Sequence, residues 1–188
     1  MSEKLPVESV AFWRSRIFES IATGKMLHQI ILDDSYDLWQ YIQSETSGHL
    51  KRHIGRNGLK VLDAGCGYGA LLCCFHMANI EVDYVGVDIS PDLLELARYR
   101  YPGREFLLCD IRKLPYPDKH FDWGITRSVA GMISDQVGPG DWDAMYAEIA
   151  RVSKRTMCME YPHGTFDQPV FCTINSGALD STRVGKRS

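Results

Sequence analysis

The stretch that most constrains this chain is a glycine-rich turn between two apolar patterns. Residues 61–69 read Val-Leu-Asp-Ala-Gly-Cys-Gly-Tyr-Gly, and apolar residues at helical spacing follow at once. Glycine at every second position permits backbone conformations that other residues avoid and lets a ligand approach the main chain. The following helix directs its free N–H groups at the turn. The stretch therefore predicts a strand, a tight turn and a helix, with a polar or anionic ligand group at the turn.

Further along the chain, apolar strand patterns alternate with helical patterns, which is typical of a parallel sheet covered on both faces. We therefore predict an α/β fold: a three-layer αβα sandwich around a mostly parallel, doubly wound sheet of six to seven strands. The C-terminal edge of the sheet is either shortened or completed by the tail. The expected strands are 59–64, 82–87, 105–109, 121–126, 156–161 and 169–174, and the expected helices are 69–78, 90–100 and one capped by Asp141.

Two amphipathic helices, at 7–23 and 35–54, precede the first strand, and Gly48 is a candidate break in the second. The length favours a single domain over residues 1–188. We expect it to consist of an N-terminal helical cap (1–56), a core that contains the sheet (57–175) and a polar tail (176–188).

The composition excludes several classes of function. A net charge of −3 and a pI near 6.1 disfavour broad nucleic-acid binding, which needs a basic face. No apolar run reaches the length of about 18 residues that a membrane span needs. The chain starts without an apolar signal segment, and its six cysteines form no Cys-x-x-Cys pair. We expect a reduced, cytoplasmic setting, with a monomer and a homodimer both open.

Three aspartates stand at the predicted carboxyl ends of consecutive strands: Asp63, Asp88 and Asp110. Ligands of open α/β sheets bind beyond these strand ends, near the point where the strand order reverses. Like charges gathered on one rim repel each other without compensating donors. The recurrence therefore indicates a binding site.

The glycine turn alone allows two interpretations. Residues 65–70 also fit the dinucleotide fingerprint G-x-G-x-x-A, and Asp88, 23 residues after Gly65, would then bind a ribose of NAD(P) in an oxidoreductase. However, Asp63 directly before the turn would place a negative charge beside a pyrophosphate. It suits a cationic ligand better, such as a sulfonium with an α-amino group.

At this point the chain resembles the class I S-adenosylmethionine-dependent methyltransferases, over roughly residues 58–161. Residues 61–69 resemble the first motif of that family, and Val-Gly-Val-Asp-Ile-Ser (85–90) resembles the end of its second strand. Residues 109–122, Cys-Asp-Ile-Arg-Lys-Leu-Pro-Tyr-Pro-Asp-Lys-His-Phe-Asp, are similar to its third and fourth motifs. The small-molecule branch, typified by the quinone-biosynthesis enzymes, is the most similar.

The resemblance implies a Rossmann-like core and S-adenosylmethionine as the cofactor, with S-adenosylhomocysteine as the product. It assigns the cofactor's amino group to Asp63, the ribose hydroxyls to Asp88 and the adenine amine to Asp110. The other positions would lie against the methionine part, the adenine, or the sulfonium and acceptor site. These further cofactor-binding residues are Gly65, Cys66, Gly67, Ile89, Ile111, Thr126 and Arg127.

The implied reaction is an in-line methyl transfer to a small-molecule acceptor, which needs a base only if the acceptor must lose a proton. Candidates for that base are Asp135, Glu160 and His163. We expect no metal: His49 and His53 have ligand spacing, but no third ligand is evident and a solvated helix face explains them better. After the fourth strand the chain reads Thr-Arg-Ser-Val, which disfavours transfer to the amino groups of nucleic-acid bases.

Two alternatives stay open beside the methyltransferase. The short C-terminal end leaves room for a catalytically inactive, S-adenosylmethionine-binding subunit that supports a partner. The dinucleotide oxidoreductase is the other.

Overall fold

The computed structural model describes residues 7–25, 36–129, 139–160 and 170–174. Their strands form one sheet of six, in the order β3-β2-β1-β4-β5-β6. The first five strands pair in parallel and β6 runs antiparallel to β5, which confirms the predicted mostly parallel sheet. The strands are β1 (Leu59–Ala64), β2 (Val82–Asp88), β3 (Glu105–Leu108), β4 (Phe121–Arg127), β5 (Ser153–Glu160) and β6 (Val170–Ile174).

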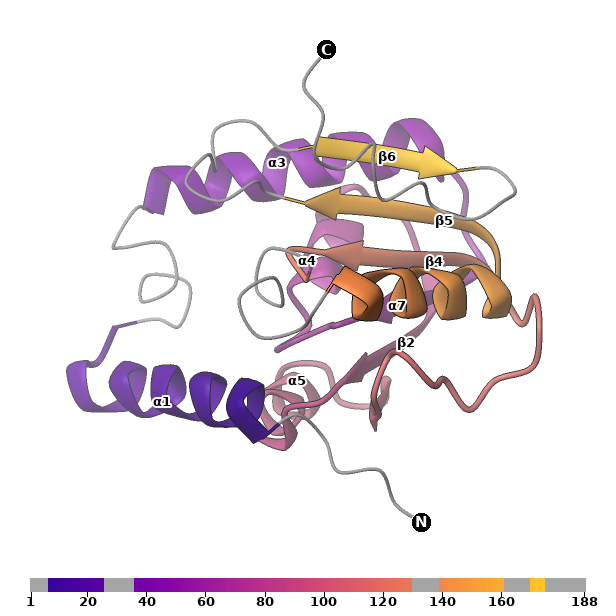
Figure 1. Cartoon of the computed structure of the whole chain (residues 1–188). Coiled ribbons are helices and arrows are strands. Elements are labelled where there is room, and N and C mark those ends of the chain that lie inside the picture. Colours follow the sequence, from indigo (N-terminus) through magenta and orange to yellow (C-terminus); the bar gives the residue numbers. More distant parts are fainter. Residues whose placement is uncertain (1–6, 26–35, 130–138, 161–169, 175–188) are drawn as a thin grey trace.

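Helices cover both faces of the sheet (Figure 1), as the three-layer prediction requires. Apolar residues of α3, α4 and α5 pack on one face, and those of α7 pack on the other. The helix α1 lies outside these layers and contacts α5, where Arg14 Nε donates to Asp92 Oδ2 at 2.9 Å. The helices are α1 (Val7–Thr23), α3 (Tyr36–His53), α4 (Ala70–Met77), α5 (Pro91–Arg100) and α7 (Pro139–Val152).

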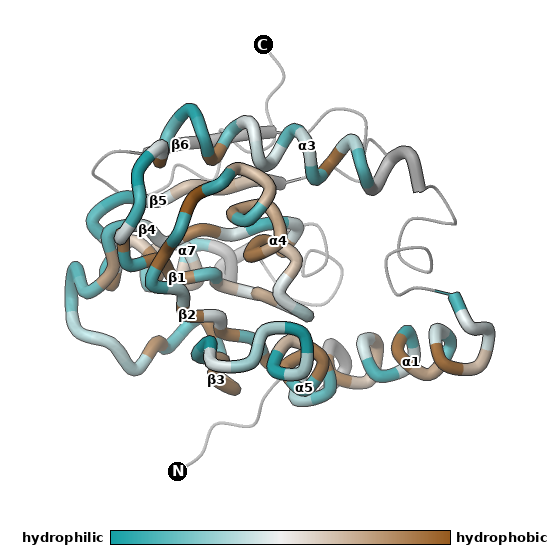
Figure 2. Tube along the Cα trace, turned by 180° about the vertical axis from the view of Figure 1, so that it is seen from behind, coloured by the Kyte–Doolittle hydropathy of each residue, from teal (hydrophilic) through white to brown (hydrophobic). Residues whose placement is uncertain are grey.

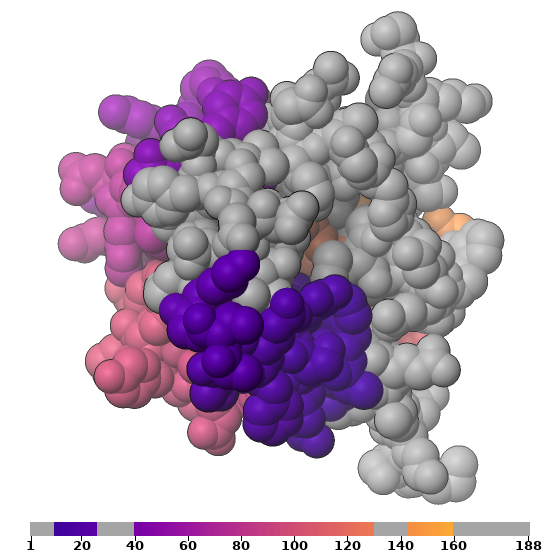
Figure 3. Space-filling model, turned by 90° about the vertical axis from the view of Figure 1, so that its left-hand side faces the viewer, coloured from indigo at the N-terminus to yellow at the C-terminus, as the bar shows by residue number. Residues whose placement is uncertain are grey.

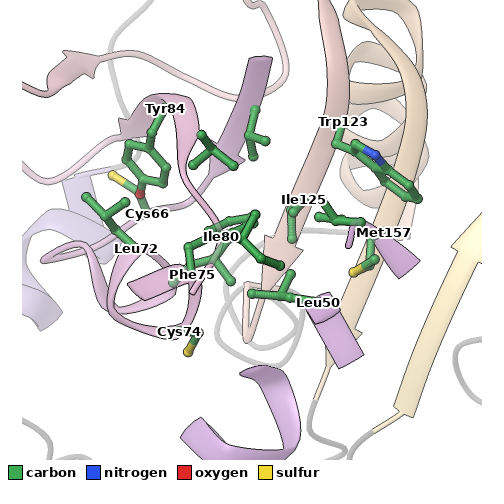
Figure 4. Packing of buried hydrophobic residues seen from close by; sticks show 14 of the residues in the cluster. Leu50, Cys66, Leu72, Cys74, Phe75, Ile80, Tyr84, Trp123, Ile125 and Met157 are labelled. Carbon is green, nitrogen blue, oxygen red and sulfur yellow. The ribbon is translucent and has the colours of Figure 1, made fainter. Parts of the chain in front are cut away.

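The sheet separates two apolar cores because successive strand residues point to opposite faces. Tyr84 and Ile125 point to the α4 face and belong to the same buried cluster as Phe75 (Figure 4), whereas Leu62 and Val87 point to the α7 face. The hydropathy colouring shows apolar segments in the strands and in α4, and polar segments along α3 (Figure 2). No helix in the described part of the chain combines the length and hydropathy of a membrane-spanning segment.

Local signals explain where α5 begins. Ser90 is its N-cap, with a hydroxyl that accepts from the Leu93 N–H at 3.3 Å, and proline occupies the first helical turn. This start is the predicted one.

Three predicted boundaries were wrong. The helix α3 continues through Gly48, since the burial of Leu50 and Ile54 outweighs the cost of about 1 kcal/mol for a helical glycine. The helix α7 begins at Pro139, before the predicted cap Asp141, and β5 begins at Ser153 rather than residue 156.

Candidate functional site

The glycine turn lies between β1 and α4, where the strand order reverses between β1 and β4. Gly65, Gly67 and Gly69 have φ values of 80°, 53° and 81°, so the predicted special conformation is present at all three. A Cβ at Gly65 would stand 2.4 Å from Val129 Cγ2, whereas at Gly67 the nearest atom would be 4.0 Å away. The turn is therefore packed at its first glycine and open at its second.

Asp88 is buried at the carboxyl end of β2, and the main chain holds both of its oxygens. Oδ2 accepts the Gly67 N–H at 2.8 Å, and Oδ1 accepts the Ser90 N–H at 2.9 Å. Burial raises the pKa of this carboxyl, while the N–H donors of Ser90, Gly67 and Ile89 oppose the rise. The carboxylate is therefore fixed against the turn, and each oxygen retains acceptor capacity.

Asp63 lies at the end of β1, two residues before the turn, and is 1% exposed. The Tyr84 hydroxyl donates to its Oδ2 at 2.5 Å. Burial raises the pKa of the Asp63 carboxyl to about 7, although the Tyr84 hydrogen bond and the Arg127 charge oppose this. The structure thus brings Asp63 and Asp88 close enough for their charges to interact.

Asp110 has a different environment just beyond β3. The ladder bond from Cys109 N to Asp88 O, 2.9 Å, keeps this segment beside the end of β2. Arg112 donates from Nη2 to Asp110 Oδ2 at 2.6 Å, and its Nε lies 3.0 and 3.1 Å from the two oxygens. Burial favours the neutral acid, but the hydrogen bonds and charge of Arg112 outweigh it and lower the pKa of Asp110. Ile111 is buried, and Ile89 is half-buried after β2.

The end of β4 carries Thr126 and Arg127 on opposite faces of the sheet. Thr126 is buried, and its hydroxyl has no hydrogen-bond partner among the described residues. Arg127 Nη1 lies 3.0 Å from Gln43 Oε1 and 3.3 Å from Cys74 Sγ. The Cys74 thiol also donates to Gln43 Oε1.

Sequence reasoning missed four residues that surround the predicted ones: Gln43, Cys74, Tyr84 and Arg112. Only Arg112 had a local signal, because an arginine two residues after an aspartate can fold back on it. Cys74, on α4, lies beside the guanidinium of Arg127 and the side-chain amide of Gln43.

The predicted base candidates receive no test. Asp135 and His163 lie outside the described residues. Glu160 is the last residue of β5, and the structure describes its backbone but not its side chain. The predicted solvated face at His49 is wrong: His49 is buried, with its ring 4.2 Å from that of the exposed His53. Burial, with the charges of His53 and Arg52, lowers the pKa of His49 to about 4. In the described ranges, no group of three metal-ligating side chains occurs.

Comparison with known proteins gives one family. The model of the "Methyltransferase domain" family matches residues 61–156, which is just over half of the chain. The chain is 30% identical over 149 residues to a malonyl-[acyl-carrier protein] O-methyltransferase of Yersinia pestis, covering 78% of this chain and 49% of that protein. It is 33% identical over 97 residues to a fatty-acid O-methyltransferase of Mycolicibacterium smegmatis, covering 50% of this chain and 33% of that protein.

Solved structures show the same fold. The PH0226 protein of Pyrococcus horikoshii OT3 superposes with a TM-score of 0.57 at 22% identity, covering 78% of this chain and 79% of that chain. The two curated relatives are longer, and the chain spans between a third and a half of their length.

Proposed function

Because the chain belongs to the class I S-adenosylmethionine-dependent methyltransferases, we propose that it transfers a methyl group from S-adenosylmethionine to a small-molecule acceptor. Members of this family use S-adenosylmethionine as their cofactor, and it is therefore the cofactor of this chain. The transfer is an in-line displacement at the sulfonium methyl, which breaks the S–CH₃ bond as the acceptor's lone pair forms the new bond. The sulfonium is already a good leaving group, so the protein contributes mainly positioning and exclusion of water.

The observation that carries this proposal is the fixation of Asp88 by the turn. Two main-chain N–H groups donate to its two oxygens, and one of these donors is Gly67. The space beside Gly67 is open, because the nearest atom would be 4.0 Å from a Cβ there. A pair of vicinal ribose hydroxyls would donate to the remaining lone pairs in a bidentate, charge-assisted arrangement. The carboxylate needs no rearrangement to accept them.

The other residues receive roles around this anchor. Asp63 binds the cofactor's ammonium group, and the main chain at Gly65, Cys66 and Gly67 runs along the methionine part. Ile89 and Ile111 flank the adenine, whose amine donates to Asp110. Because Arg112 already occupies four acceptor positions of Asp110, we expect the adenine amine to compete with Arg112 rather than meet a bare carboxylate. Thr126 and Arg127 border the sulfonium and the acceptor.

The names of the two relatives guide the choice of acceptors. One acts on malonyl-[acyl-carrier protein] and the other on a fatty acid, and both are named O-methyltransferases. A carboxylate oxygen is ionised at neutral pH and needs no base for methyl transfer. A first panel of acceptors should therefore contain free fatty acids and malonyl thioesters, with a hydroxyquinone as the acceptor that must lose a proton.

The test is calorimetric titration of the chain and of Asp88→Ala with S-adenosylhomocysteine. We expect Asp88→Ala to weaken binding by roughly 1.5–3 kcal/mol, the scale of hydrogen bonds to a charged group. Asp83→Ala is the matched control, because Asp83 is an exposed aspartate on the same strand.

Three outcomes would count against parts of this proposal. Equal affinity of Asp88→Ala and the unchanged chain would refute the ribose assignment. Tight binding of a nicotinamide dinucleotide without binding of S-adenosylhomocysteine would favour the oxidoreductase. Binding without transfer to any acceptor in the panel would favour the supporting subunit.

A further inference from the structure

The fully buried Tyr84 makes a contact that the proposed mechanism has not used. Tyr84 is 2% exposed, and its hydroxyl donates to Asp63 Oδ2 at 2.5 Å. In the sheet, Tyr84 pairs with Val61, and Gly86 pairs with Asp63. The Tyr84 hydroxyl therefore reaches from its own pair level to that of Asp63, toward the turn. A Cβ at Gly86 would lie 2.8 Å from both Cys66 Sγ and Phe106 Cδ1, so the space at this glycine is filled by those two side chains. Figure 4 shows Tyr84 beside Cys66 at this end of the core.

The surroundings of Asp63 disfavour its charge. Asp88 on β2 adds like charge, and the Cys66 thiol on the turn and the Cys74 thiol on α4 are buried and have raised pKa values. Arg127 on β4 is the cation whose charge reaches Asp63, but its Nη1 is directed at Gln43 and Cys74. Among the described residues, Tyr84 provides the side-chain hydrogen bond that the Asp63 carboxylate accepts.

We propose that Tyr84 is a positioning residue for the cofactor: its hydroxyl favours the ionised form of Asp63 over the neutral one and orients the carboxylate toward the cofactor's ammonium group. This inference rests on the proposed role of Asp63. The alternative is a purely structural role, in which the buried hydroxyl uses Asp63 only as its hydrogen-bond acceptor. The two differ in their effect on the pH dependence of binding.

The sign of that dependence follows from the charges. An ammonium group binds the ionised carboxylate, so below the pKa of Asp63 in the free protein, about 7, binding must first release a proton. Affinity then falls by up to about tenfold for each pH unit. Removing the Tyr84 donor raises this pKa further, because a hydrogen bond to the charged form lowers it. The fall in affinity should then begin at higher pH.

The experiment is titration calorimetry of the chain and of Tyr84→Phe with S-adenosylhomocysteine between pH 5.5 and pH 8.5. We expect the midpoint of the pH dependence to rise by about one unit in Tyr84→Phe, the equivalent of one charge-assisted hydrogen bond. At pH 7 the affinity should fall about fivefold, and at pH 8.5 less than about twofold. Titration of the ligand's own amine is common to both proteins and cancels.

Two controls separate positioning from packing. Tyr146→Phe removes a hydroxyl from another buried tyrosine, which contacts Cys158 Sγ at 3.3 Å on the α7 face, and should leave the midpoint unchanged. 5′-Methylthioadenosine lacks the amino-acid part, so its affinity should not depend on Tyr84 or on pH in this range. An unchanged midpoint in Tyr84→Phe, or an equal shift with the ligand that lacks the amine, would overturn the proposal.

A further variant covers the case in which Tyr84→Phe does not fold. Asp63→Asn keeps an acceptor for the Tyr84 hydroxyl but cannot ionise, so its binding should be weak and independent of pH across this range. Retention of the original midpoint in Asp63→Asn would show that another group titrates. If the unchanged chain binds no S-adenosylhomocysteine at any pH, the failure is that of the proposed function instead.

Discussion

Asp63, Asp88 and Asp110 are the same side chain at three neighbouring strand ends, and the protein gives each a different electrostatic environment. Main-chain N–H groups hold Asp88, a phenol contacts Asp63, and a guanidinium neutralises Asp110. The mutual repulsion that the sequence implied is reduced by these donors. Ser90 and Arg112, each two positions from the aspartate it contacts, supply two of these donors, whereas Gly67 and Tyr84 are each 21 residues away from theirs.

The first glycine of the turn provides a test at the scale of one residue. Gly65→Ala forces a side chain into φ 80° and places its Cβ 2.4 Å from Val129 Cγ2. Gly103→Ala is the matched control, because Gly103 has φ 83° with nothing within 4 Å of a Cβ. We expect a loss of about 1–2 kcal/mol of unfolding free energy at Gly103 from backbone strain alone, and a clearly larger loss at Gly65. Urea unfolding measures both; equal losses would contradict the packing at Val129.

At the scale of elements, the strands and the start of α5 were predictable because their signals are local. Apolar runs ended by aspartate mark β1 and β2, and Ser90 with Pro91 marks the helix start. The continuation of α3 through Gly48 was not predictable, since packing that the sequence does not display decides it. The same holds for the pairing of Gln43 with Arg127, which are 84 residues apart.

The contact of α3 with the site predicts that Gln43 stabilises the chain. Gln43 is 1% exposed, and its Oε1 accepts from both Arg127 and the Cys74 thiol. Gln43→Leu keeps the volume but removes the acceptor, so we expect a loss of about 1–3 kcal/mol in unfolding free energy. Gln40→Leu, the same change at an exposed position of α3, should have a much smaller effect. Similar denaturation midpoints for the two variants would show that the pairing contributes little.

At the scale of the whole molecule, a sheet with helices on both faces and α1 at the surface (Figure 3) matches the predicted architecture, and β6 is the edge strand of the sheet that the described residues form. Whether the tail adds to this edge stays a prediction. The division into cap, core and tail stays a prediction. The sequence did not predict how much the buried site lowers the stability of the folded chain. Two buried carboxyls with raised pKa values make the ligand-free chain less stable at neutral pH.

That cost can be measured through Asp63. Its pKa is about 7 in the folded chain and about 3.9 in an unfolded one, so between these values the folded state retains a proton that the unfolded state releases. The contribution of Asp63 to the unfolding free energy therefore falls as the pH rises through this range, and it is constant above the range. We expect Asp63→Asn to raise the unfolding free energy at pH 8 by roughly 1–3 kcal/mol more than at pH 5. Asp83→Asn, at an exposed position of β2, should change both values equally; the same result for Asp63→Asn would contradict the raised pKa.

The reversed direction of β6 has a practical consequence. Its last residue, Ile174, pairs with Thr156 rather than with the end of β5, so the described chain leaves the sheet toward the rim where the parallel strands begin. The glycine turn and the three aspartates occupy the other rim. A fluorophore or surface-immobilisation handle attached next to Ile174 would therefore report on ligand titrations from a distance, without crowding the cofactor.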